Sequence, residues 1–265
     1  MSFVFPKIMG IVNVTPDSFS DGGLFLSVKE AVEQSLILID DGADIIDIGG
    51  ESTRPGANEV SEEDEFNRVI PLIEKLNKLR PEIIISIDTT KSNVAKAACD
   101  YGATIINDIG GLSINQDLAN IAREYNASLI LMHIQGKPRT MQQNPSYEDV
   151  TQEVFDYLKE KIELAKQFEV KNVIADVGIG FGKTLEHNLD LLKNHIKFKE
   201  LDVPLCLGIS RKSFIGKLLN IENPKERDIP TALIHALLLN AGADIIRVHN
   251  VKNITLLKYL TKYFI

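Results

Sequence analysis

One pattern recurs three times along this chain and restricts its fold more than any other feature. In each copy a Gly-Ala pair ends a helix, an Ile-rich run follows, and polar residues stand at the far end of the run. The copies are DGADIIDIGG from Asp41 to Gly50, YGATIINDIGG from Tyr101 to Gly111, and AGADIIRVHN from Ala241 to Asn250. Glycine favours the left-handed turn that ends a helix, and Ile-rich runs suit buried parallel strands. The pattern predicts β/α units with polar chemistry at the C-terminal ends of the strands.

Eight apolar runs in all alternate with helical patterns. The runs are Ile8–Val12, Asp44–Ile48, Ile83–Ile87, Thr104–Ile106, Ser128–Met132, Asn172–Ala175, Leu205–Ile209 and Asp244–Val248. They predict a (β/α)₈ barrel of the α/β class, formed as a single domain by residues 1–265. The alternative is an open doubly wound sheet, which usually has a Gly-rich turn after its first strand. Here that turn reads NVTPD, from Asn13 to Asp17, so we expect the barrel.

Two helix boundaries follow from local signals. The pattern Ser27-x-x-Glu30 is typical of a capping box, which predicts that the first helix begins there. Apolar spacing predicts another helix over Leu185–Phe198.

Composition limits the partners of the chain. Its 29 basic and 37 acidic residues give a net charge of −8, which argues against nucleic acid or an anionic membrane as a general partner. No apolar run approaches 18 residues and no signal-peptide pattern opens the chain, so we expect no membrane span and a cytoplasmic location. Cys99 and Cys206 are expected to be buried, reduced thiols rather than a disulfide.

The stretch GIGFGKT, from Gly178 to Thr184, resembles a nucleotide-binding loop but fails its spacing. A P-loop needs glycine five positions before Gly182, where the chain has Val177. The dinucleotide spacing G-x-G-x-x-G fails as well, because its third glycine would fall at Lys183. What remains is Asp176 at a strand end, followed by a flexible loop.

Carboxylates and an amide stand at three predicted strand ends. Asp88 and Asp176 each follow an apolar run, and Asn107 ends another. An aspartate in such a place often caps the next helix, and that alternative stays open. If all three side chains enter one barrel mouth, they suit a flat heterocycle rich in donors, because an amidine-like edge pairs with carboxylate as a guanidinium does.

Donors and positive charge gather at three other strand ends: Ser52-Thr53-Arg54, Lys212-Ser213 and Arg247-x-His249. In an acidic protein this local excess suggests an anionic group such as phosphate, although scattered surface charge is the alternative. His187, His195 and His235 fall in helical patterns and are expected to be structural, whereas His133 has no obvious partner.

Together these segments resemble the dihydropteroate synthase family. The resemblance rests on eight motifs in family order across nearly the whole chain. They are KIMGIVNVTPDSFSDGG (Lys7–Gly23), GGESTRPG (Gly49–Gly56), IDTTK (Ile87–Lys91), INDI (Ile106–Ile109), MHIQGKPRTMQ (Met132–Gln142), GIGFGK (Gly178–Lys183), GISRKS (Gly208–Ser213) and RVH (Arg247–His249). Two positions depart from the family pattern: Val177 stands where the family usually has proline, and Asn250 where it usually has aspartate.

The resemblance implies a folate-pathway transferase with a (β/α)₈ fold. Such an enzyme joins 4-aminobenzoate to the methylene carbon of a dihydropterin diphosphate, releasing diphosphate, with Mg²⁺ as cofactor and a homodimer as the expected assembly. By motif, the pterin would be held by Asp88, Asn107, Asp176 and Lys212. The diphosphate would be held by Asn13, Thr53, Arg54, Arg247 and His249, with Asn13 also contacting the metal. The aminobenzoate would lie among Phe19, Thr53, Pro55, Phe181, Lys212 and Ser213.

Two other functions compete with this hypothesis. A methyltetrahydrofolate-dependent methyltransferase of the same barrel type would share the pterin carboxylates but would not need a diphosphate clamp. A non-catalytic pterin binder would be expected to lack one of Asn13, Arg54, Lys212 and Arg247, and the chain has all four.

Overall fold

The computed structural model describes residues 4–15, 23–52, 59–239 and 242–264. The predictions made for Phe19, Thr53, Arg54 and Pro55 therefore lie outside the described residues. Within the described ranges, parallel strands close into a barrel in the order β1 to β8, with each strand paired to its sequence neighbours and β8 paired to β1. The predicted fold class is confirmed.

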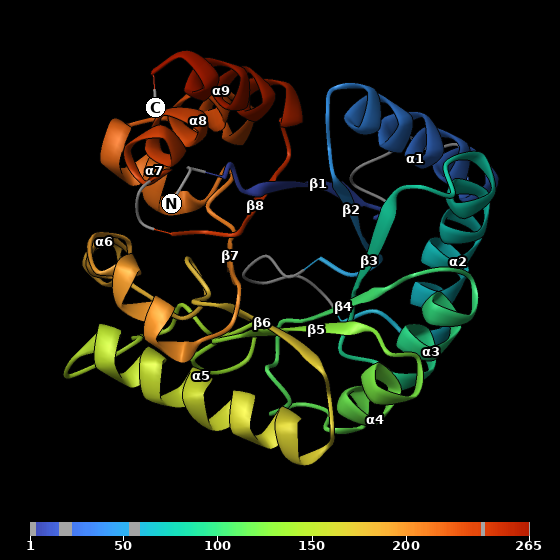
Figure 1. Ribbon diagram of the computed structural model, residues 1–265, viewed down its shortest axis with the longest axis horizontal. Coiled ribbons are helices and arrows are strands. Elements are labelled where there is room, and N and C mark those ends of the chain that lie inside the picture. The colour runs from blue at the N-terminus through green and yellow to red at the C-terminus, as the bar shows by residue number, and fades with distance from the viewer. Residues whose placement is uncertain (1–3, 16–22, 53–58, 240–241, 265) are drawn as a thin grey trace.

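The strands are short and the helices surround them (Figure 1). The strands are β1 (Lys7–Asn13), β2 (Ile45–Gly49), β3 (Ile84–Asp88), β4 (Ile105–Asp108), β5 (Ser128–Met132), β6 (Asn172–Asp176), β7 (Leu205–Leu207) and β8 (Ile245–Val248). The helices are α1 (Gly23–Asp40), α2 (Glu62–Leu79), α3 (Ser92–Asp100), α4 (Asp117–Glu124), α5 (Val150–Gln167), α6 (Leu185–Lys193), α7 (Ser213–Leu219), α8 (Asp228–Leu237) and α9 (Val251–Phe264), with 3₁₀ turns η2 (His195–Leu201) and η3 (Pro224–Arg227).

Two helix boundaries differ from those predicted. Helix α1 begins at Gly23, so Ser27 lies inside it and does not cap it. A Ser-x-x-Glu pattern can also occur within a helix, and only the backbone distinguishes the two cases. The helix expected over Leu185–Phe198 ends at Lys193, and the tighter η2 turn follows.

The barrel interior is built in layers. Side chains alternate along a strand, so residues two positions apart face the same side. The lower layer is apolar and consists of Met9, Ile45, Ile84, Ile105, Ile130, Ile174, Cys206 and Ile245. Two residues further along their strands, Asp47, Asn107, Asp176 and Arg247 face the same interior. The upper layer is therefore polar although the floor beneath it is not.

A larger apolar core lies between the strands and the surrounding helices. The outward-facing residues of the strands, such as Ile46, Ile87 and Leu129, pack there against helical residues such as Leu72 and Leu158. Cys99 and Cys206 are both buried and unpaired, as predicted. Among the described residues, no helix is both long and apolar enough to cross a bilayer.

Candidate active site

The C-terminal ends of the strands bring the predicted polar side chains to one mouth. Across β1, β2, β3 and β4, Asn13 is in register with Gly49, Gly49 with Asp88, and Asp88 with Asn107. A cavity at this end is lined by residues from β3 to β8 and from the connections that follow these strands. Its lining is Asp88, Asn107, Ile109, Met132, Asp176, Ile179, Phe181, Gly208, Lys212 and Arg247. The structure thus gathers the four predicted pterin residues with Phe181 and Arg247.

Neither Asp88 nor Asp176 caps the helix that follows it. Helix α3 has Lys91 at its N-cap, and α6 is capped by the side chain of Thr184. Asp176 instead accepts a hydrogen bond from the backbone N of Gly178 at 2.8 Å. The helix-cap alternative is therefore wrong for both residues, and both carboxylates face the cavity.

Arg247 lies between the carboxylate of Asp47, which is buried, and that of Asp88, which is partly exposed. Its Nε donates to Asp47 Oδ2 at 2.6 Å, and its Nη2 donates to Asp88 Oδ2 at 2.7 Å. Asn107 Nδ2 also donates to Asp47 Oδ2, at 3.2 Å. This guanidinium joins β8 to β2 and β3 across the barrel, and it neutralises carboxylates that would otherwise be costly to bury.

Asp47 belongs to the site although the sequence interpretation gave it no role. Its side chain is fully buried, and the second oxygen, Oδ1, has no hydrogen-bond partner among the described residues. The signal in the sequence was a charged residue two positions after Ile45, within an otherwise apolar strand. Its alternation with Ile45 predicts an inward-facing carboxylate.

Burial shifts the protonation equilibria of the mouth. Loss of water raises the pKa of Asp88 to about 7, an effect reinforced by Asp47 and Glu65 and opposed by Arg247 and Lys212. Burial also raises the pKa of Asp176, although Gly178 and nearby cations oppose it.

The pKa values of the two cations in the mouth shift in opposite directions. Burial together with Arg247 lowers the pKa of Lys212 to about 7, against the attraction of Asp176 and Asp88. The pKa of Arg247 is raised instead, because the attraction of Asp47 and Asp88 outweighs burial. Groups whose pKa is brought near neutrality in one cavity are typical of functional sites.

Lys212 and Phe181 form one side of the cavity. The ammonium of Lys212 lies 3.8 Å from the centroid of the Phe181 ring. Phe181 packs with Ile109, Met132 and Met141 in a small apolar cluster. An aromatic face, a cation and a polar layer of carboxylate and amide groups together suit a flat ligand with one polar edge.

The loop after β6 is held by a buried lysine. Lys183 Nζ donates to the carbonyl oxygens of Gly178 at 2.9 Å and Phe181 at 3.0 Å, and it lies 2.8 Å from Nδ1 of His133. Burial, and to a lesser extent the nearby charge of Lys183, lowers the pKa of His133 to about 2, so this imidazole is neutral and can accept the bond. His133, which had no assigned partner, thereby fixes the loop that carries Phe181.

The remaining described residues of the predicted set lie beside the cavity. His249 follows β8, and both its backbone N, at 3.1 Å, and its Nδ1, at 3.0 Å, bond Ser210 Oγ. Asn13 ends β1, and Ser213 is the first residue of α7. Within the described ranges, no group of three or more His, Cys, Asp or Glu side chains could hold a metal ion.

The chain is similar to known proteins over most of its length. The model of the family described as "Pterin binding enzyme" matches residues 9–249. The dihydropteroate synthase of Escherichia coli K12 is 47% identical over 249 residues, which is 93% of this chain and 87% of the relative. That of Synechocystis is 45% identical over 247 residues, covering 92% and 85%.

Solved structures lead to the same family. A dihydropteroate synthase from Xanthomonas albilineans with 4-aminobenzoic acid has a TM-score of 0.91 at 39% identity, covering 99% of this chain and 94% of that one. Another from the same organism, in complex with 7,8-dihydropteroate, has a TM-score of 0.86 at 36% identity, covering 98% and 95%. The chain belongs to the pterin-binding enzyme family and, within it, to the dihydropteroate synthases.

Proposed function

We propose that this chain catalyses the condensation of a (7,8-dihydropterin-6-yl)methyl diphosphate with 4-aminobenzoate, giving 7,8-dihydropteroate and diphosphate in folate biosynthesis. The observation that carries the proposal is the composition of the mouth. Two carboxylates and an amide lie in the same cavity as Lys212, Arg247 and an aromatic ring. The ligands of the Xanthomonas relatives, 4-aminobenzoic acid and 7,8-dihydropteroate, match the proposed substrate and product.

The pterin ring occupies the cavity above the apolar floor. Its amino and ring N–H groups donate to Asp176 and Asp88, and Asn107 supplies both a donor and an acceptor. Lys212 donates to an acceptor of the ring from the side of Phe181. Asp88 exchanges part of its pairing with Arg247 for the ligand when the pterin enters.

The diphosphate lies toward Arg247, His249 and Asn13, with Thr53 and Arg54 completing the clamp. Mg²⁺ usually binds proteins through one or two side-chain oxygens and fills its remaining positions with phosphate oxygens and water. The amide oxygen of Asn13 at the end of β1 suits that role. When bound, Mg²⁺ supplies charge that stabilises the departing diphosphate.

The aminobenzoate lies at the outer side of the cavity, against Phe181, Lys212 and Ser213, with Phe19, Thr53 and Pro55, which lie outside the described residues, completing its binding set. Its amine then faces the pterin methylene carbon.

The reaction is a dissociative substitution. An aromatic amine is a weak nucleophile, so the help comes from the leaving-group side, where Arg247 and His249 stabilise the charge that grows on diphosphate. The cation on the pterin methylene is delocalised into a ring that lies above Asp88 and Asp176. Positional isotope exchange in the labelled diphosphate, without net turnover, is the expected observation. Isotope effects that fit a bimolecular transition state, with no exchange, would contradict it.

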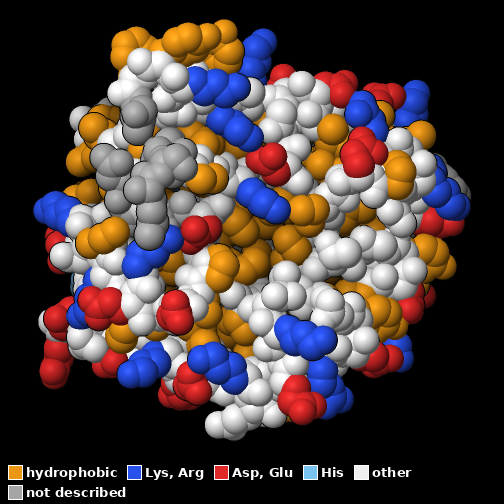
Figure 2. All heavy atoms as spheres, viewed as in Figure 1, with side chains coloured by type: hydrophobic (Ala, Val, Ile, Leu, Met, Phe, Trp, Pro, Cys, Tyr) orange, Lys and Arg blue, Asp and Glu red, His pale blue; other side chains and the backbone are white. Residues whose placement is uncertain are grey.

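A homodimer forms through α8 and α9. Exposed apolar residues recur every four positions on both helices: Ile229, Leu233 and Leu237 on α8, and Leu256, Leu260 and Phe264 on α9. Leu237 and Phe264 are 84% and 81% exposed. Figure 2 has hydrophobic side chains gathered at the edge where Figure 1 places these helices. Such a patch is typical of an interface between protein chains.

Analytical ultracentrifugation tests the assembly. Leu233→Glu should shift the dimer to monomer, whereas Leu79→Glu, on the exposed face of α2, should not. A monomeric parent protein would refute the dimer. Residues 1–265 act as one catalytic domain in the cytoplasm, a location that the two unpaired cysteines support.

A product assay separates the proposed reaction from its rivals. The purified chain, the pterin diphosphate, 4-aminobenzoate and Mg²⁺ should yield dihydropteroate and diphosphate in a one-to-one ratio. A methyltransferase would release no diphosphate, and a non-catalytic binder would bind the pterin without product. Either result would refute the proposal.

A further inference from the structure

Arg211 occupies a strained position between two residues that reach the site. Its φ of 59° lies in the left-handed region, which side chains other than glycine rarely adopt. On one side of it, Ser210 bonds His249. On the other side, Lys212 points its ammonium over Phe181 in the cavity. The conformation of this one residue therefore determines how the β7–α7 connection presents both neighbours.

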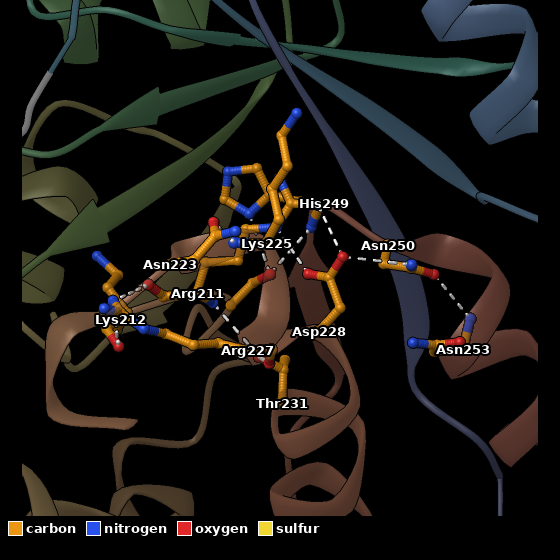
Figure 3. Close-up of polar contacts among 11 residues, drawn as sticks. Arg211, Lys212, Asn223, Lys225, Arg227, Asp228, Thr231, His249, Asn250 and Asn253 are labelled. Atoms are coloured by element: carbon orange, nitrogen blue, oxygen red, sulfur yellow. Dashed lines mark hydrogen bonds and ion pairs between the residues drawn. The ribbon is translucent and has the colours of Figure 1, made fainter. Parts of the chain in front are cut away.

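Contacts from η3 and α8 hold Arg211 in that conformation (Figure 3). Its backbone N donates to Thr231 Oγ1 at 3.3 Å, and its carbonyl accepts from Arg227 Nη1 at 3.1 Å. Its guanidinium makes a two-bond pair with Asp228, through Nε at 2.6 Å and Nη2 at 2.8 Å. A strained backbone conformation persists where several contacts hold it in place, and here Thr231, Arg227 and Asp228 each contact Arg211.

Asn250 extends this network to the segment after β8, the strand that carries Arg247 and is followed by His249. Its Nδ2 donates to Asp228 Oδ2 at 3.4 Å, while its Oδ1 accepts from the backbone N of Asn253 in the first turn of α9. An aspartate at position 250 would put a second carboxylate against Asp228, which already pairs with Arg211. The amide that distinguishes this chain from the family pattern is therefore matched to the carboxylate at position 228.

We propose that Arg211, Asp228 and Asn250 form a positioning network for catalysis. It fixes the β7–α7 connection to the β8–α9 connection, and so sets the spacing between Lys212 and His249. None of the three lines the cavity, so each acts through a neighbour rather than on the substrate. The proposal rests on the proposed function for its kinetic consequence, but its structural part can be measured without turnover.

A double-mutant cycle tests the network. Asp228→Asn removes the only carboxylate of the network and keeps the side-chain size. Asn250→Asp adds a second carboxylate and keeps an oxygen that can cap α9. Each single variant should raise the KM for the pterin diphosphate about tenfold, because small displacements of binding groups have effects of that order or larger. The double variant again has one carboxylate and one amide, so its KM should return to within about threefold of the parent value.

Two further measurements separate positioning from general stability and from failure of the proposed reaction. The order of the variants by melting temperature should differ from their order by KM. The control Asp190→Asn, which makes the same change of charge at an exposed position on α6, should leave both the melting temperature and KM unchanged. Amide hydrogen exchange of residues 209–213 in the ligand-free chain should be faster in each single variant and close to the parent rate in the double variant. Two results would overturn the network even if turnover is absent. One is an unchanged exchange rate in the single variants, and the other is an exchange rate in the double variant as fast as the two single effects added together.

Discussion

Asp176→Asn is the substitution whose effect follows most directly from the geometry of the cavity. Asp176 uses Oδ1 to accept from Gly178 N at 2.8 Å, and its remaining acceptor capacity faces the cavity. An asparagine that keeps the bond to Gly178 through its oxygen turns its N–H groups toward the donor edge of the pterin. The variant therefore loses an attraction and acquires a clash between donors.

The expected cost is about 3 kcal/mol. A hydrogen bond to a charged group contributes roughly 1.5–3 kcal/mol, and leaving a buried donor unpaired costs a further 1–3 kcal/mol. Relaxation of the side chain offsets part of that sum. Because each 1.4 kcal/mol is a factor of ten, the dissociation constant of the pterin should rise about 150-fold.

Isothermal titration calorimetry with a 6-hydroxymethyl dihydropterin measures this effect without turnover. The control is Asp108→Asn, which alters another buried carboxylate in the barrel. Asp108 accepts from the backbone N of Gly110 and Leu112, and it is adjacent to Asn107, so it faces away from the cavity. The control should lose stability but bind the pterin within about threefold of the parent. An Asp176→Asn protein that also binds within threefold would refute the assignment.

Three further outcomes are expected. Arg247→Ala removes the cation that pairs with Asp47 and Asp88, and leaves Asp47 with the Asn107 amide as its hydrogen-bond donor, so the free energy of unfolding in urea should fall by about 3 kcal/mol and turnover should slow; a loss below about 1 kcal/mol would contradict the pairing. Burial raises the folded-state pKa of Asp88 to about 7, so this group contributes stability that is complete below about pH 4 and is lost as the pH rises through 7. The melting temperature should therefore fall between pH 5 and pH 8, and Asp88→Asn should remove this dependence on pH. Lys183→Met removes the bonds that hold the loop of Phe181, so KM for 4-aminobenzoate should rise more than KM for the pterin; equal changes would show that the loop acts only through stability.

The sequence predicted the barrel because its strongest signal is periodic. Each Gly-Ala stop and Ile-rich run carries its own evidence for a β/α unit, so errors at single boundaries did not alter the fold. The helix start at Ser27 was wrong because a capping pattern is only four residues long and can recur inside a helix.

Part of the site could be predicted from the sequence for the same reason. Residues at strand ends meet at one mouth whatever the loops do, which is why Asp88, Asn107, Asp176, Lys212 and Arg247 could be grouped in advance. Their binding roles stay predictions.

Contacts between side chains far apart in the chain could not be predicted from the sequence. The bond between Lys183 and His133 spans 50 positions, and the pair of Arg211 and Asp228 depends on a left-handed backbone that no residue pattern announces.

A crystal structure with the dihydropterin diphosphate and Mg²⁺ tests the arrangement of charge in the mouth most directly. We expect the donor edge of the ring within hydrogen-bond distance of Asp88 and Asp176, and the diphosphate against Arg247 and His249. A ring bound outside the barrel mouth, or a diphosphate held beside Asp176 with the ring turned toward His249, would contradict it.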